Sequence, residues 1–296
     1  MAGQIVRGAL YDLAPEDLKG KEVVFQTGGL SQVWRVERLP SEMAEMREYE
    51  QVKTIVIPEL VKMGITKDGT TSRFDDRKVS LRGVLVVDSE VVVSTSLTYY
   101  QAHEEDITRN YKGNAAMQEV AQQQYGDKWA LHARNMGAAV TFVTLDGSAF
   151  PGVRKNTRLY NGWINAAAGN KKSAQDASMP AFLVDALKEL REEYGRSIEV
   201  VGEPEFVGIA SHPMKGDADA TWVARINKRD SFFESGEWEK DRRDAEHGPL
   251  VKVSSPEERD QLLNINSLHG NTYPGVMYST ALGLDALVDR HFARLE

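Results

Sequence analysis

The stretch Asp185-Ala186-Leu187-Lys188-Glu189-Leu190-Arg191-Glu192-Glu193-Tyr194-Gly195 carries most of the information about the fold and chemistry of this chain. Its acids Glu189, Glu192 and Glu193 are spaced so that they are neighbours on a helix. Three adjacent negative charges repel unless a cation lies among them, and a hard divalent ion such as Mg²⁺ takes oxygen ligands. Taken alone, such a glutamate-rich amphipathic helix is more often a solvated face than a metal site.

The same stretch has an apolar stripe that predicts a helix over residues 179–194. Its members recur at helical period, so the helix can pack on a core by that stripe and hold its acids beside it. We expect Gly195 to end the helix as a left-handed C-cap. The stripe consists of Leu183, Leu187, Leu190 and Tyr194.

Strand signals lie on both sides of this helix. The β-branched and apolar residues 138–145 end in the turn Asp146-Gly147, which predicts a buried strand before a loop. A second short strand over 162–169 runs into a loop of small residues. After the helix we predict strands over 198–210 (broken near Pro204), 221–227 and 250–254, and a charged loop over 228–248. One helix is predicted to begin at Ser255, and a final helix to span 281–295.

The first part of the chain predicts mixed α and β structure. We expect a strand over 22–26, a mainly helical stretch over 41–64, a hairpin of 79–87 with 91–97, and a polar helix over 114–125. The chain is predicted to divide into an N-terminal α+β region, residues 1–133, whose role the sequence does not indicate, and a second domain, residues 134–296.

Composition excludes several functional classes. The 296 residues are 41% hydrophobic and 27% charged, which is typical of a globular protein, and the net charge of −8 argues against broad nucleic-acid binding. There is no cysteine, so disulfides, thiolate metal sites and cysteine nucleophiles are excluded. Without a secretory signal or a long apolar run, we expect a cytoplasmic protein with no membrane partner.

The order of these elements resembles the Nudix hydrolase domain. That family's signature is Gly, five residues, Glu, seven residues, Arg-Glu, an aliphatic residue, any residue, Glu-Glu, any residue, Gly and an aliphatic residue. Residues 188–195 match its second half, with Lys188 in place of Arg and Arg196 in place of the final aliphatic residue. Its first half has diverged, because the signature Gly falls on Ala174 and its Glu on Pro180.

The divergence of the first half is consistent with an insertion. Gly169 lies five residues before the signature position, so a five-residue insertion between the glycine loop and the helix would restore the spacing. Asp176 could then replace the missing Glu by pairing with Lys188. The resemblance covers roughly residues 134–265.

The resemblance implies an α+β fold, an α/β/α sandwich around a mixed sheet, and a metal-dependent hydrolase. The substrate would be a phosphoanhydride in a nucleotide or in a nucleoside diphosphate linked to another moiety. Glu189, Glu192 and Glu193 would bind Mg²⁺ or Mn²⁺, with Glu192 and Glu193 counted as catalytic. The general base would be Glu246, with alternatives at Glu203, Glu205, Glu237 and Glu239.

Several residues near the glycine loop are candidates for substrate contacts. Arg154, Lys155 and Arg158 could bind phosphates, because a guanidinium suits bidentate binding, although a solvated basic turn explains them equally well. Gly169 would shape the loop. Trp163 and Trp222 could stack on a base, although buried aromatics are more often core residues.

Two other functions stay open, because Ala166-Ala167-Ala168 stands where the family usually has Pro-Gly. One is a Nudix-like binding or sensor module that holds a nucleotide without cleaving it. The other is hydrolysis of a nucleotide's glycosidic bond. In each case the partner is a nucleotide-like small molecule, and a homodimer is compatible with the sequence. The segment His103-Glu104-Glu105-Asp106 is interpreted as solvated rather than as a metal site.

Overall fold

The chain forms a mixed α+β structure, as the sequence predicts. A computed structural model describes residues 11–27, 77–99, 103, 111–129, 132–155, 160–170, 177–213 and 215–290. Its central sheet has five strands in the order β1-β9-β10-β5-β8. β5 and β10 are parallel and the other pairs are antiparallel, so the sheet is mixed. The strands are β1 (Tyr11–Leu13), β5 (Met136–Val143), β8 (Ala167–Asn170), β9 (Glu205–Ser211) and β10 (Ala218–Arg225).

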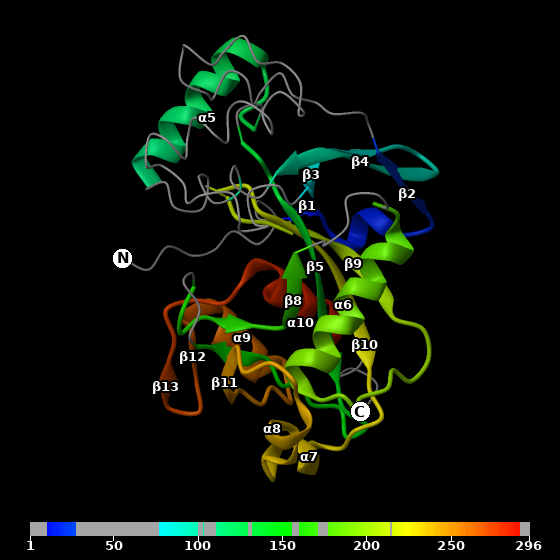
Figure 1. Ribbon diagram of the computed structural model, residues 1–296, viewed down its shortest axis with the longest axis vertical. Helices are drawn as coiled ribbons and strands as arrows, with labels where there is room; N and C mark the ends of the chain where they lie inside the picture. The colour runs from blue at the N-terminus through cyan, green and yellow to red at the C-terminus, as the bar shows by residue number, and fades with distance from the viewer. Residues whose placement is uncertain are drawn as a thin grey trace, which may run out of the picture.

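Two long helices cover the sheet and make the predicted α/β/α sandwich. α6 (Met179–Tyr194) and α10 (Tyr278–Arg290) both pack against it (Figure 1). Successive side chains along a strand point to opposite faces of the sheet, so two apolar clusters form, one on each face. One holds Phe142 of β5 with Phe182 and Leu190 of α6, and the other holds Val143 with Leu282 and Leu287 of α10.

α6 has the predicted bounds, and its ends have clear causes. The Ser178 hydroxyl caps the helix by accepting from the Ala181 N–H at 3.4 Å, and Pro180 lies in the first turn, where it removes no helical hydrogen bond. The predicted cap at Gly195 is wrong in conformation. Its φ of 152° and ψ of 128° lie outside the left-handed helical region, because the chain leaves the helix extended, against the Asp241 carboxylate.

Segments from the first part of the chain join the central structure. β1 pairs with β9, and Arg134 donates from Nη2 to the Asp12 carboxylate at 2.9 Å. Val79, Leu81, Val91 and Val93 belong to the same apolar cluster as α6. These residues come from β3 (Arg77–Val86) and β4 (Glu90–Tyr99), the predicted hairpin, beside which β2 (Glu22–Thr27) runs parallel to β4.

The division into residues 1–133 and 134–296 stays a prediction. The polar helix is confirmed as α5 (Tyr111–Tyr125) and ends at Gly126, whose φ is +70°. The predicted helical stretch 41–64 lies outside the described residues. None of the helices in the described ranges has the length and apolar character needed to cross a lipid bilayer.

The prediction of a charged loop over 228–248 is wrong. This stretch contains α7 (Asp230–Glu234) and α8 (Glu237–Asp241), and β11 (His247–Leu250) begins inside it. Phe233 and Trp238 anchor the two short helices in the core, an apolar signal that the surrounding charges obscure in the sequence. β11 joins β6 (Gly152–Arg154) and β7 (Ile164–Asn165) in a second sheet, and β12 (Ser267–Leu268) pairs with β13 (Asn271–Thr272) after α9 (Pro256–Ile265).

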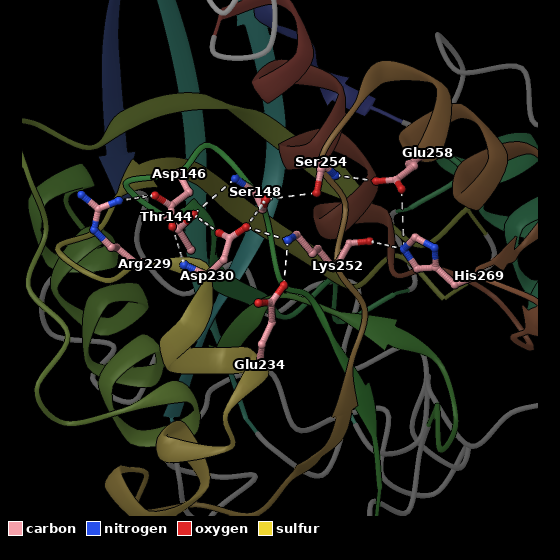
Figure 2. Close-up of polar contacts among 10 residues, drawn as sticks. All are labelled: Thr144, Asp146, Ser148, Arg229, Asp230, Glu234, Lys252, Ser254, Glu258 and His269. Carbon is pink, nitrogen blue, oxygen red and sulfur yellow. Dashed lines mark hydrogen bonds and ion pairs between the residues drawn. The ribbon is translucent and has the colours of Figure 1, made fainter.

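A polar network holds α7 against the turn after β5 (Figure 2). The Asp230 carboxylate accepts from Thr144 Oγ1 at 2.5 Å, Ser148 Oγ at 2.7 Å and Lys252 Nζ at 2.8 Å. Burial alone would raise the pKa of Asp230, but these three hydrogen bonds outweigh it and lower the pKa below its ordinary 3.8.

We expect Asp230→Asn to destabilise the protein by about 1–3 kcal/mol at pH 7, because charge-assisted hydrogen bonds are lost. A lowered carboxyl pKa stabilises the fold above the unfolded-state value, and that contribution is lost as the pH falls through the folded-state value. The difference in unfolding free energy between variant and wild type, measured by urea unfolding, should therefore disappear as the pH drops below 3.8. A gap that is unchanged between pH 7 and pH 3 would contradict this account.

Candidate functional site

One cavity of about 410 Å³ brings together most of the residues predicted from the sequence. It lies where β8, β10, α6 and the segment before β11 meet. Arg158 lies outside the described residues, and Trp163 does not line this cavity. The predicted residues that do line it are Arg154, Gly169, Glu189, Glu192, Glu193 and Glu246.

Glu189 lies directly on the backbone of Gly169. A Cβ atom at Gly169 would be only 2.6 Å from the carboxyl carbon of Glu189, so the absence of a side chain makes room for this acid. The glycine that the sequence analysis assigns to the loop therefore positions the first glutamate of the acidic helix. Gly169 therefore matters because it has no side chain to displace the Glu189 carboxylate, and not because it allows a flexible turn.

Glu193 is a buried acid at the inner wall of the cavity. Its residue is 3% exposed, and its Oε2 lies 3.1 Å from His247 Nε2. Burial raises the pKa of Glu193 well above its ordinary 4.5; Glu189 and Glu246 raise it further, and Arg154 lowers it. Burial also lowers the pKa of His247 to about 4, so the imidazole is neutral at pH 7 and can donate one N–H to Glu193.

Glu192 is surrounded by cations. Its Oε1 lies 3.0 Å from Arg243 Nη1 and 3.8 Å from Lys188 Nζ. These groups, with Arg191 and Arg196, line a separate hollow of about 480 Å³ that adjoins the first at Glu192. The Glu192 carbonyl also accepts from the backbone N–H groups of Arg243 and Asp244, both at 2.8 Å, which ties the segment before β11 to α6.

That tie places Glu246 in the cavity, where Arg154 pairs with it. Arg154 Nη2 lies 3.3 Å from Glu246 Oε2, and the Lys155 N–H donates to the Glu246 carbonyl at 2.7 Å. A cation and a candidate base therefore face the same space from β6 and from the segment before β11. The four alternative bases are exposed and do not line the cavity: Glu203, Glu205, Glu237 and Glu239.

The two predicted stacking aromatics have other contacts. Trp222 is 1% exposed and packs on Phe206 in the core, so the idea that it stacks on a base is wrong. Trp163 covers Gly275 and meets the Tyr160 ring edge-on at 5.4 Å. Tyr160, not Trp163, is the aromatic residue that lines the cavity.

Sequence reasoning missed a second group of residues that line the cavity. His103, predicted to be solvated, is buried and pairs with Asp217 at 3.1 Å between Nδ1 and Oδ1. Lys78, Asn135 and Asp219 also line the cavity. Apart from Asp217 and Asp219, these residues lie far apart in the chain, and the tertiary fold brings them together.

The donor set fits a hard divalent cation in charge and atom type. The carboxylates of Glu189 and Glu246 raise the pKa of Glu193, a repulsion that a bound cation would relieve. Across the described part of the chain, however, no three acidic or histidine side chains are grouped as metal ligands. In this structure Glu193 is hydrogen-bonded to His247 and Glu192 to Arg243.

We expect Gly169→Ala to lower kcat/KM on the order of 10- to 100-fold, because the new methyl group must displace the Glu189 carboxylate. The unfolding free energy should change by less than about 1 kcal/mol, since the displaced atoms end a flexible side chain. Steady-state kinetics and thermal unfolding test both parts. Gly83→Ala is the matched control, because a Cβ there meets nothing within 4 Å. Wild-type kinetics in Gly169→Ala would show that this contact is unimportant.

Comparisons with known proteins show only distant likeness. No family model matches the chain, and no curated protein matches it. Among solved structures, a Nudix hydrolase from Alicyclobacillus acidocaldarius is 14% identical, with a TM-score of 0.38, over 54% of this chain and 93% of that one. The ORF135 protein of E. coli is 18% identical, with a TM-score of 0.33, over 54% and 93%. Tm1382, provisionally assigned as a Nudix hydrolase, is 14% identical, with a TM-score of 0.33, over 51% and 69%. TM-scores this low do not establish a shared fold, so any functional conclusion depends on the site itself.

Proposed function

We propose that this chain is a divalent-metal-dependent hydrolase that cleaves a phosphoanhydride in a nucleotide or in a nucleoside diphosphate linked to another moiety. One observation carries the proposal. A single cavity combines the acids Glu189 and Glu193 of one helix with a guanidinium, Arg154, and a further carboxylate, Glu246. Phosphoanhydride hydrolysis requires acids that hold a cation, a group that binds phosphate, and a base.

Each side chain has a role in this scheme. Glu189, Glu192 and Glu193 would hold Mg²⁺ or Mn²⁺, which neutralises charge on the phosphates and lowers the pKa of a bound water. Arg154 binds a phosphate oxygen, for which it must exchange its contact with Glu246. Glu246, released from that ion pair, accepts the proton of the attacking water. His247 holds Glu193 in position by its hydrogen bond.

The test is turnover of nucleoside diphosphates and nucleotide sugars with Mg²⁺ and with Mn²⁺, followed as released phosphate and as free base. Cleavage should stop with EDTA and return when metal is added back. Glu192→Gln should lower kcat/KM roughly 10- to 100-fold, while Glu239→Gln, an exposed acid outside the cavity, leaves it unchanged. Metal-independent turnover, or full activity of Glu192→Gln, would refute the metal assignment, and release of free base would point to glycosidic cleavage.

A second candidate is a module that binds a nucleotide without cleaving it. The contacts of Glu192 and Glu193 favour it, because two of the three acids of the helix already have protein partners. Calorimetry with a nucleotide in the presence of Mg²⁺ separates the two functions. Binding without any product after prolonged incubation would support the module and count against the hydrolase.

A further inference from the structure

The cavity is lined by two chemically different groups of side chains. Glu189, Glu193 and Arg154 are the residues assigned above to metal and phosphate, and the second group consists of Lys78, His103, Asp217 and Asp219. Lys78 and His103 are 5% and 7% exposed, while Asp217 and Asp219 are half-buried. Folding buries such groups at a cost unless protein or ligand groups satisfy them.

Asp219 is held with its carboxylate on the strand backbone. A Cβ at Gly137 would be 2.5 Å from Asp219 Oδ1, so only a glycine at this position of β5 leaves room for the acid. Burial raises the pKa of Asp219 from 3.8 to about 6 and Asp217 adds to the rise, while a hydrogen bond with Ser279 and the charges of Arg154 and His103 lower it. At pH 7 the group is therefore mainly an anion, and it offers acceptor oxygens toward the cavity.

Charge determines which part of a ligand fits the second group. The acids of α6 are proposed to hold a metal ion that attracts phosphate, whereas Asp217 and Asp219 are assigned no metal and would repel a phosphate at close range. A neutral group rich in N–H donors would instead pair with their oxygens, and a carboxylate binds two adjacent N–H groups in bidentate fashion. Tyr160 also lines the cavity, and an aromatic side chain suits a planar group.

We propose that Lys78, His103, Asp217 and Asp219 form the specificity subsite for a nucleobase that presents a ring N–H beside an exocyclic amine, as guanine does. Asp219 accepts from both donors. The inference rests on the proposed function for its orientation, with the phosphates at Arg154 and the base at Asp219. It also assigns a role to the N-terminal region, because Lys78 and His103 supply one wall of the subsite.

Nucleoside monophosphates test this subsite without hydrolysis, since they contain no phosphoanhydride. Calorimetry with GMP, IMP, AMP and UMP in Mg²⁺ should give the tightest binding for GMP. IMP lacks only the exocyclic amine and should bind roughly 10- to 100-fold more weakly, the range for loss of a bidentate base contact. Asp219→Asn, which preserves shape, should remove the preference for GMP over IMP, and Asp88→Asn in the exposed turn between β3 and β4 should keep it.

The outcomes separate this inference from the proposed function. Equal affinity for GMP and IMP in the wild-type protein overturns the subsite and needs no variant, even if metal-dependent turnover is found. No binding of any nucleotide overturns it as well. A GMP preference that Asp219→Asn abolishes supports the subsite, even if no phosphoanhydride is cleaved. A preference unchanged in Asp219→Asn assigns base recognition to other residues and refutes the role of Asp219 as the acceptor for the base.

Discussion

Glu193→Gln is expected to lower kcat/KM on the order of 10²- to 10³-fold, because the site loses the negative charge of its most buried acid. The same change should stabilise the metal-free protein. Burial raises the pKa of Glu193 above 4.5, and its neighbours Glu189 and Glu246 add to that shift, so the ionised acid is disfavoured in the fold. Glutamine has the same shape and carries no charge.

The pH dependence of this stabilisation has a definite sign. When the folded-state pKa of an acid is raised, the folded protein binds more protons than the unfolded chain between the two pKa values. The wild-type protein in EDTA should therefore lose stability relative to Glu193→Gln as the pH rises above 4.5, and Mg²⁺ should reduce the difference. Urea unfolding at pH 5 and pH 8 measures it. A variant that is inactive and also less stable at pH 8 would show that the acid serves packing rather than cation binding.

Gly208→Ala is expected to destabilise the protein by about 3 kcal/mol or more. Gly208 has a φ of +139°, and a Cβ there would overlap the Leu13 carbonyl oxygen, a backbone atom that cannot rotate away. It lies beside the irregular register between β9 and β10, where a bulge requires glycine. The melting temperature should fall by roughly 6–12 °C.

Gly83→Ala is the control for this prediction as well. Gly83 is also in a strand next to a register shift, but a Cβ there meets no atom within 4 Å. Its melting temperature should stay within about 2 °C of wild type. Equal losses for the two substitutions would mean that the close contact with Leu13 is not the cause.

Local signals predicted the elements that have strong periodicity. α6 begins and ends where its apolar stripe and Gly195 indicate, and the hairpin of β3 and β4 follows from its two β-branched runs. α7 and α8 escaped prediction because each is only five residues long and has a single buried aromatic anchor. Charged neighbours dominate such a short window.

The site was predictable where its residues carry a local signal in the sequence. Glu189, Glu192 and Glu193 stand out by spacing, and Glu246 by its place before a strand. Asp219 and Lys78 have no local signal, because the register of β10 on β5 and of β3 on β4 determines where they lie. His103 was wrongly predicted to be solvated, because its sequence neighbours are acidic. Its partner Asp217 lies 114 residues away, so the local sequence does not reveal the contact.

The pairing of β1 with β9 affects how the protein can be produced. A fragment that begins at residue 134 would lack Leu13 and Asp12, and would leave the backbone N–H and C=O groups of Ile209 and Ala210 without their partners on one side. The uncovered strand is seven residues long and buried over most of its length. An exposed apolar sheet edge of that kind is a template for intermolecular strand addition. Such a fragment would be prone to self-association, so the full chain is the appropriate form for expression and assay.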